Sequence, residues 1–197
     1  MQKCYSVAMH IEYEATFLDL DKDEMRLRLT NAGAKLLRPE FSQRRTILLL
    51  PHLKHARKEW MRVRDEGDKV TLAWKAIGEA GIDDQREIQI TVDNYDATVE
   101  LLVKMGCVSK SYQETLRVLW ILDGVEICID TWPFLEPYVE VEGASEAEVR
   151  SVSEKLGFDW STAYFAGVGR FYQMKYGDHA DPSETPRLTF DMQNPYA

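Results

Sequence analysis

The sequence predicts a protein of the α+β class, in which an antiparallel sheet of about eight strands is accompanied by three or four helices. Period-two alternation of apolar and polar residues dominates the first two-thirds of the chain, as in the segment from Ile11 to Ala15. Short turns such as Asp123-Gly124 join most strand segments, and hairpins connect antiparallel strands. Because an antiparallel sheet of this size often curls until its edges meet, we expect a closed or nearly closed barrel.

The strand segments are recognised by alternation or by β-branched and aromatic residues between turn signals. Gly67-Asp68 marks the turn between the third and fourth segments, and Asp123-Gly124 the turn between the sixth and seventh. Strands are predicted at residues 11–15, 41–51, 59–65, 69–76, 85–92, 113–122, 125–131 and 137–142.

Each of the first three helices begins at a capping residue. Asp21 and Asn94 are typical N-cap residues, and Ser145 with Glu148 forms a capping box. Gly106 ends the second helix. Helices are predicted at about 21–31, 93–105, 145–156 and 161–176, followed by an irregular tail over residues 178–197 that contains three prolines.

The composition excludes several classes of protein. Apolar residues make up 45% of the 197 residues and charged residues 29%, which is ordinary for a globular protein and excludes a disordered or fibrous one. With 33 acidic against 24 basic residues the net charge is −9, so nucleic-acid and membrane partners are not expected. The three cysteines (Cys4, Cys107, Cys128) are widely spaced, and no signal-peptide-like or membrane-spanning apolar run is present. We therefore expect a cytoplasmic protein.

Ionisable residues of the same sign recur at i and i+2 on several predicted strands, with apolar residues on the reverse face. A sheet whose polar face meets water explains any one of these strands. Like charges on one face repel each other, however, whereas carboxylate pairs hold Mg²⁺ or Mn²⁺ and arginine pairs bind phosphate oxygens. The pattern therefore predicts a metal-bridged polyphosphate site. The doublets are Glu12-x-Glu14, Arg62-x-Arg64 and Glu140-x-Glu142, and on a further strand Glu126, Cys128 and Asp130 share one face.

The order and spacing of these residues resemble the CYTH superfamily. Its members are the triphosphate tunnel metalloenzymes, which include class IV adenylyl cyclases, thiamine triphosphatases and inorganic triphosphatases. The resemblance runs from about residue 10 to about residue 176, so that residues 1–177 are expected to form the domain. It rests on Glu12-x-Glu14, Arg62-x-Arg64, Leu72-Ala73-Trp74-Lys75, Arg86-Glu87, Arg117, Asp130 and Glu140-x-Glu142.

The resemblance implies a barrel with a charged tunnel inside and helices outside. One divalent ion would orient the phosphate chain, and a second would activate the attacking group. Carried over by position, the catalytic residues are Glu12, Glu14 and Glu142. The metal ligands are Glu12, Glu14, Glu87, Asp130, Glu140 and Glu142. The phosphate ligands are Arg62, Arg64, Lys75 and Arg117, with Arg44 or Arg45 as additions.

The predicted function is hydrolysis of an inorganic or organic triphosphate with Mg²⁺ or Mn²⁺, by a monomer or homodimer. Thr16 stands where the family signature has a lysine, and Gln89 where a second acidic residue is common. These departures leave open a tunnel protein that binds polyphosphate or nucleotide without turnover. A class IV cyclase, which converts ATP to cyclic AMP and pyrophosphate, is a further alternative, although His10 lacks the following phenylalanine typical of that class.

Overall fold

The computed structural model describes residues 10–53, 59–77 and 85–197; Cys4 lies outside these ranges. The strands are β1 (His10–Phe17), β2 (Lys35–Leu49), β3 (Glu59–Asp65), β4 (Val70–Ile77), β5 (Gln85–Val92), β6 (Val108–Leu122), β7 (Val125–Thr131), β8 (Tyr138–Gly143) and β9 (Arg187–Leu188). The helices are α1 (Lys22–Asn31), α2 (Tyr95–Lys104), α3 (Glu146–Lys155) and α4 (Gly169–Tyr176), with a 3₁₀ turn, η1, at Trp160–Thr162.

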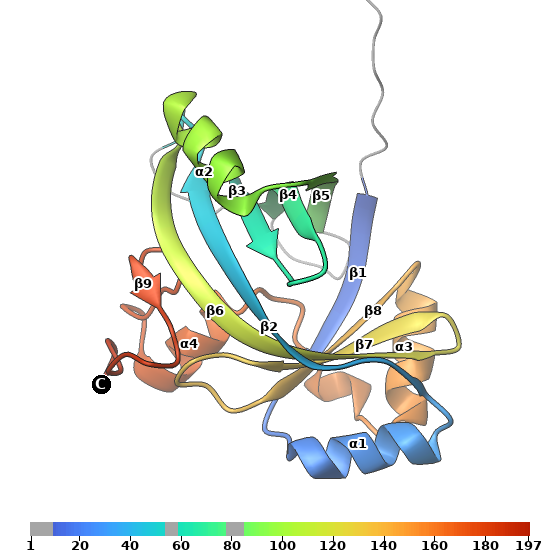
Figure 1. Ribbon diagram of the computed structural model, residues 1–197. Helices are drawn as coiled ribbons and strands as arrows, with labels where there is room; N and C mark the ends of the chain where they lie inside the picture. Colours follow the sequence, from blue (N-terminus) through green and yellow to red (C-terminus); the bar gives the residue numbers. More distant parts are fainter. Residues whose placement is uncertain (1–9, 54–58, 78–84) are drawn as a thin grey trace, which may run out of the picture.

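The strands form one strongly curled sheet, a half-barrel built around the long strands β2 and β6 (Figure 1). Hydrogen-bonded neighbours follow the order β2-β3-β4-β5-β1-β8-β7-β6-β9, and β2 also pairs with β6. All pairings are antiparallel except that of β9 with β6. The predicted antiparallel sheet is therefore confirmed. The predicted closed barrel with a charged tunnel is replaced by a curled half-barrel, and among the described residues β1 pairs with β5 only from His10 to Glu12.

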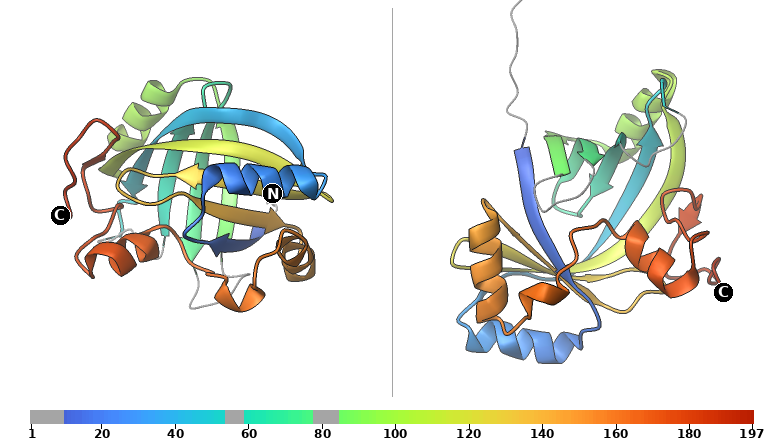
Figure 2. Two further views of the ribbon diagram at one scale, coloured as in Figure 1. Left: turned by 90° about the horizontal axis from the view of Figure 1, so that it is seen from below. Right: turned by 180° about the vertical axis from the view of Figure 1, so that it is seen from behind.

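Helices α1, α2 and α3 lie on the convex side of the sheet, as predicted (Figure 2). Helix α4 departs from this prediction, because its Phe171 and Tyr172 pack with Trp132 and Tyr138 at one end of the concave face. Met25 and Leu29 of α1, with Val149 and Val152 of α3, pack on apolar residues of β1, β6, β7 and β8. Asp21 caps α1, Asn94 caps α2 and Ser145 caps α3, each by accepting hydrogen bonds from backbone N–H groups of the first turn. The apolar reverse of the charged strands is thus the core. None of the described helices is both long and apolar enough to cross a membrane.

The prediction of one helix over residues 161–176 is wrong. The chain forms η1, then an extended segment, and only then α4. Tyr164 interrupts the helix because its backbone N–H and C=O both pair with Thr16 of β1, at N···O distances of 2.9 Å. This bridge places the segment before α4 beside β1.

Candidate active site

Strand alternation places the predicted site residues other than Arg44 on the concave face of the sheet. Along β1, Glu12, Glu14 and Thr16 point to the side opposite the core residues Ala15 and Phe17. The same alternation on β7 and β8 separates the ionisable residues from the buried isoleucines and valines. The concave face therefore gathers the charges that the sequence pattern singled out.

At one end of this face carboxylates meet across neighbouring strands. Glu14 lies directly opposite Glu142, and Glu142 lies opposite Glu126 of β7 on its other side. Glu140 is flanked in the same way by Thr16 of β1 and Cys128 of β7. We refer to Glu14, Glu140 and Glu142 as the carboxylate cluster.

The pKa values of the carboxylate cluster show that its negative charges are poorly compensated. Burial, together with the charges of Glu140 and Glu142, raises the pKa of Glu14 well above its ordinary range. Burial and the neighbouring Asp130 raise the pKa of Glu140 to about 7, although Arg117 opposes them. Burial and the charge of Glu12 also raise the pKa of Glu142. A bound cation would favour the ionised form of all three groups.

The chemistry of the carboxylate cluster fits a hard divalent cation. Its donors are all carboxylate oxygens, the ligands that Mg²⁺ and Mn²⁺ prefer. Burial and repulsion between neighbouring carboxylates raise their pKa values, and a bound divalent ion would offset both effects. Within the described ranges, no three acidic, histidine or cysteine side chains already stand in the arrangement of a metal site. Binding would therefore require the three side chains to turn toward the ion.

The other predicted metal ligands are held by ion pairs with predicted phosphate ligands. The Nζ atom of Lys75 lies 2.9 Å from Oε2 of Glu12 and 3.7 Å from Oε2 of Glu87. Glu87 also accepts a hydrogen bond from Arg62 at 3.0 Å. Burial acts to raise the pKa of Glu12, but a hydrogen bond with Glu87 and the charge of Lys75 lower it to about 2. Glu12 is therefore ionised and fixed on Lys75.

Arg117 forms a second ion-paired group beside the carboxylate cluster. Its Nε donates to Asp130 at 2.7 Å, and its Nη2 donates to Glu140 at 2.7 Å. The two carboxylates outweigh the effect of burial and raise the pKa of Arg117 well above its ordinary value. Arg117 thus links the acidic end of the concave face to its basic centre.

The basic centre consists of Arg45, Arg62 and Arg64. Burial and the charges of Arg64 and Arg62 lower the pKa of Arg45 to about 9. Burial and the charge of Arg62 lower the pKa of Arg64 to about 10. The Nε atoms of all three arginines are buried without a hydrogen-bond acceptor in the described part of the chain. Buried donors that repel one another and lack acceptors indicate a site for an anion with several oxygens.

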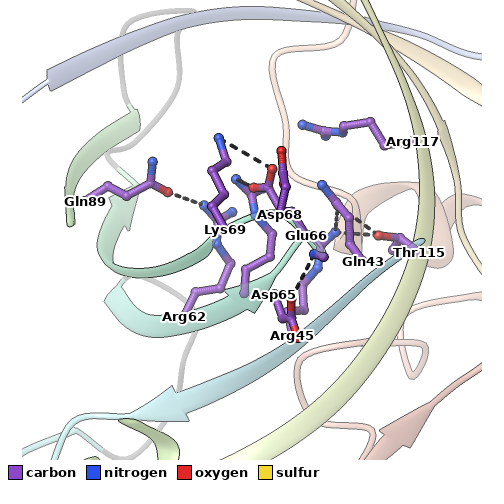
Figure 3. A network of polar contacts seen from close by, with 12 residues as sticks. Gln43, Arg45, Arg62, Asp65, Glu66, Asp68, Lys69, Gln89, Thr115 and Arg117 are labelled. Atoms are coloured by element: carbon purple, nitrogen blue, oxygen red, sulfur yellow. Dashed lines mark hydrogen bonds and ion pairs between the residues drawn. The ribbon is translucent and has the colours of Figure 1, made fainter. Parts of the chain in front are cut away.

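Arg45, rather than its neighbour Arg44, belongs to this centre. The Nη2 of Arg45 donates to Gln43 at 2.8 Å and to Thr115 of β6 at 2.6 Å (Figure 3). Arg44, a predicted phosphate ligand, lies on the convex face. There it donates to Asp65 at 3.0 Å and covers the ring of Tyr95 at 4.4 Å. Adjacent strand residues point to opposite faces, so the position of Arg44 separates it from the site.

Several residues that line the site are absent from the sequence prediction. Glu66 forms an ion pair with Arg64 at 2.7 Å, although it follows the end of β3. Gln43 shares a face of β2 with Arg45, and their i, i+2 spacing in the sequence could have indicated that both line the site. Cys128 lies between the acidic residues of β7, where burial raises the pKa of its thiol well above the ordinary value and keeps it protonated.

Solved structures similar to this chain share its fold at low sequence identity. A conserved hypothetical protein from Pyrococcus furiosus is 17% identical, with a TM-score of 0.67 over 79% of this chain and 96% of that one. A candidate adenylate cyclase from Vibrio parahaemolyticus is 9% identical, with a TM-score of 0.68 over 80% and 94% of the two chains. A candidate adenylyl cyclase from Hippeastrum, described as having a dominant triphosphatase activity, is 12% identical, with a TM-score of 0.54 over 85% and 95%.

Comparison with curated protein sequences finds no match. The family model of the CYTH domain matches residues 10–164, which is most of the chain. This range contains the carboxylate cluster, the basic centre and the ion pairs that connect them. The chain therefore belongs to the CYTH domain family.

Proposed function

We propose that this protein binds a triphosphate compound on its concave face and hydrolyses it with the help of Mg²⁺ or Mn²⁺. The observation that supports this most strongly is the basic centre, in which three arginines have buried Nε donors that lack a partner among the described residues. A triphosphate carries several negative charges and many acceptor oxygens along a short chain. It would therefore relieve both the mutual repulsion and the missing hydrogen bonds of the arginines.

The ion pairs of the site support binding of a charged ligand. Lys75, Arg62 and Arg117 are held by Glu12, Glu87 and Asp130 in positions that point across the concave face. Charge-assisted hydrogen bonds from such fixed donors lose little conformational entropy on binding. Phosphoryl transfer depends mainly on this kind of positioning and charge stabilisation.

Glu14, Glu140 and Glu142 would hold the divalent ion. When bound, such an ion neutralises phosphate oxygens and lowers the pKa of a bound water molecule. Arg117 would assist by keeping Glu140 oriented, because its Nη2 donates to that carboxylate while its Nε is held by Asp130. Thr16 adds only a neutral hydroxyl beside Glu140, so it supplies no positive charge to a bound phosphate chain.

The described activity of the Hippeastrum protein favours hydrolysis over cyclisation for this fold. Because the two chains are only 12% identical, the activity of that protein guides the choice of substrates to test. A cyclase would release pyrophosphate and a cyclic nucleotide, whereas a triphosphatase releases orthophosphate or pyrophosphate without cyclisation. The two functions are thus separated by their products. The cytoplasm as location and a monomer or homodimer as the assembly belong to the same proposal.

A screen of metals against substrates tests this function. Tripolyphosphate, ATP and thiamine triphosphate would each be incubated with the full chain and Mg²⁺, Mn²⁺ or EDTA, and the products separated by chromatography. We expect metal-dependent release of phosphate from at least one compound, and none in EDTA. Cyclic AMP as the main product from ATP would replace hydrolysis by cyclisation. Metal-dependent binding without any turnover would reduce the proposal to a binding protein.

A further inference from the structure

The C-terminal segment, defined here as residues 169–197, forms a wall at one side of the concave face. β7 pairs with β6 from Leu116 to Leu122 only. Where β7 has left this edge, β9 takes its place and pairs with β6 at Tyr112 and Gln113. The C-terminal segment lies beyond residue 164, where the match to the CYTH domain ends. Figure 2 shows it packed beside β6.

The C-terminal segment reaches the concave face at the level of Arg45. The carbonyl oxygen of Pro182 accepts hydrogen bonds from Ser111 Oγ and Gln113 Nε2, both at 2.8 Å. Gln113 lies directly opposite Arg45 in the β2–β6 pairing. Along the concave face of β6, residues that follow Gln113 therefore face the site, whereas the C-terminal segment covers the side chains of Ser111 and Gln113.

Aromatic rings complete this wall behind Arg45. The guanidinium of Arg45 lies 4.7 Å from the centre of the Trp132 ring. Trp132 meets Tyr172 of α4 edge-on, with ring centres 6.4 Å apart. The hydroxyl of Tyr172 donates to the carbonyl oxygen of Pro133 at 2.6 Å, and Tyr138 packs against α4 in the same buried group. Beyond Arg45 the concave face is thus filled by packed side chains.

Three donors without acceptors belong to residues that are in contact with one another at this wall. Gln43 Nε2, Arg45 Nε and Trp132 Nε1 lack a hydrogen-bond partner in the described part of the chain. Their residues are only 2%, 6% and 4% exposed, and Arg45 contacts both of the others. An internal phosphate of a chain has two non-bridging oxygens, whereas a terminal phosphate has three and a higher charge. The number of donors matches the terminal group.

We propose that Gln43, Arg45 and Trp132 recognise the free terminal phosphate of the substrate, and that the C-terminal segment prevents the phosphate chain from extending past them. This inference rests on the proposed binding of a triphosphate and adds a requirement to it, namely that one end of the phosphate chain must be free. Trp132 acts as a positioning residue for Arg45 as well as a donor. Linear phosphates and nucleoside triphosphates meet the requirement. Cyclic phosphates, and chains capped at both ends, fail it.

Calorimetric titration of the full chain with Mg²⁺ tests this requirement. The ligands with a free end are imidotriphosphate, which resists hydrolysis, and pyrophosphate. The ligands without one are cyclic trimetaphosphate and diadenosine triphosphate. We expect each free-ended ligand to bind at least about tenfold more tightly than either ligand without an end. Pyrophosphate and trimetaphosphate have similar charge at neutral pH, so their comparison, made both with and without Mg²⁺, separates the free end from net charge and from chelation of the metal.

Equal affinities for the ligands with and without a free phosphate end would overturn the inference and leave the proposed function intact. Failure of imidotriphosphate to bind, with or without Mg²⁺, would instead overturn the proposed function, and the inference would fall with it. The two failures are therefore distinguished in one set of titrations.

Variants of Trp132 provide a second test. Trp132→Leu removes both the ring beneath Arg45 and the Nε1 donor, whereas Trp132→Phe keeps a ring. We expect Trp132→Leu to lower the preference for linear over cyclic ligands about tenfold, and Trp132→Phe to lower it less. Trp160→Leu is the matched control, since Arg150 covers that ring outside the site at 5.8 Å. An unchanged preference in a folded Trp132→Leu protein would overturn the inference.

Gln43→Met keeps the test decisive if Trp132→Leu fails to fold. It removes one unpartnered donor at nearly constant size and leaves the aromatic wall intact. We expect this variant to lower the preference for pyrophosphate over trimetaphosphate. A preference equal to that of the parent protein would count against the three-donor arrangement.

Discussion

Glu14 of β1 and Glu142 of β8 are directly opposite residues on the concave face of the sheet. Directly opposite side chains on neighbouring antiparallel strands lie close together, so two like charges there destabilise the sheet. Burial strengthens the effect and raises the pKa of both carboxyl groups. The pair is therefore a structural cost to the ligand-free protein, and a divalent cation between the two carboxylates would remove it.

The first prediction concerns Glu14→Gln. Without metal this variant should be more stable than the parent protein, by up to about 1 kcal/mol, because the repulsion with Glu142 and Glu140 is gone. Mn²⁺ should raise its melting temperature less than it raises that of the parent. Thermal unfolding in EDTA and in Mn²⁺ measures both effects, with the exposed Glu100→Gln of α2 as the control. A parent-like response of Glu14→Gln to Mn²⁺ would remove Glu14 from the metal site.

The second prediction compares two neighbours on β2. Arg45→Gln should raise the Kd for tripolyphosphate about 10- to 100-fold, since one charge-assisted contact contributes roughly 1.5–3 kcal/mol. Arg44→Gln should leave that Kd nearly unchanged, because Arg44 lies on the convex face beside Asp65. Titration calorimetry with tripolyphosphate and orthophosphate makes the comparison. Equal losses in both variants would indicate attraction by net charge alone.

The third prediction concerns Thr16, which is buried on the concave face opposite Glu140. Thr16→Lys would place an ammonium group among the carboxylates and within reach of a bound phosphate. We expect triphosphate affinity or turnover to rise by up to about tenfold, which corresponds to one contact of roughly 1.4 kcal/mol. Thr16→Val serves as the control for loss of the hydroxyl. Slower turnover in Thr16→Lys would show that the site is adapted to the neutral residue.

The fourth prediction is a loss of stability with rising pH in the metal-free protein. The pKa of Glu140 is about 7 in the fold and near 4.5 in an unfolded chain. Between these values the folded state holds a proton that the unfolded state has released, so raising the pH through this window favours unfolding. We expect Glu140 alone to lower the free energy of unfolding by roughly 1–3 kcal/mol between pH 4.5 and pH 7, and no further above it.

Urea denaturation in EDTA at several pH values measures this dependence. Glu140→Gln should flatten the curve, because its amide cannot ionise but can still accept a hydrogen bond from Arg117. The raised pKa values of Glu14 and Glu142 act in the same direction. Stability that increases across this window would contradict the carboxylate cluster as described.

Much of the sheet could be predicted because turn residues mark its ends. β3, β5 and β7 have the predicted bounds, and Asp123-Gly124 joins β6 to β7 as expected. The first part of β2 was missed because its pairing with β6 shifts register between Leu36 and Phe41. Such irregularities break the alternation on which the prediction depends.

The choice between Arg44 and Arg45 could not be made from the sequence. The apolar run Ile47–Leu50 follows them without alternation, so it does not fix which face of β2 is buried. The face on which the acidic doublets of β1 and β8 lie could be predicted, because apolar residues alternate with them strictly. The contact of Arg45 with Trp132, and the wall formed by the C-terminal segment, depend on packing between distant parts of the chain. No local pattern encodes these contacts.

A crystal structure of the full chain with Mn²⁺ and imidotriphosphate tests the central claim most directly, because the anomalous signal of manganese locates the ion without assumption. The account predicts a manganese ion coordinated by carboxylates of Glu14, Glu140 and Glu142. It also predicts a phosphate chain across Arg62, Arg64 and Arg117 whose end lies against Arg45. Manganese on other residues, or the phosphate chain on the convex face beside Arg44, would contradict it.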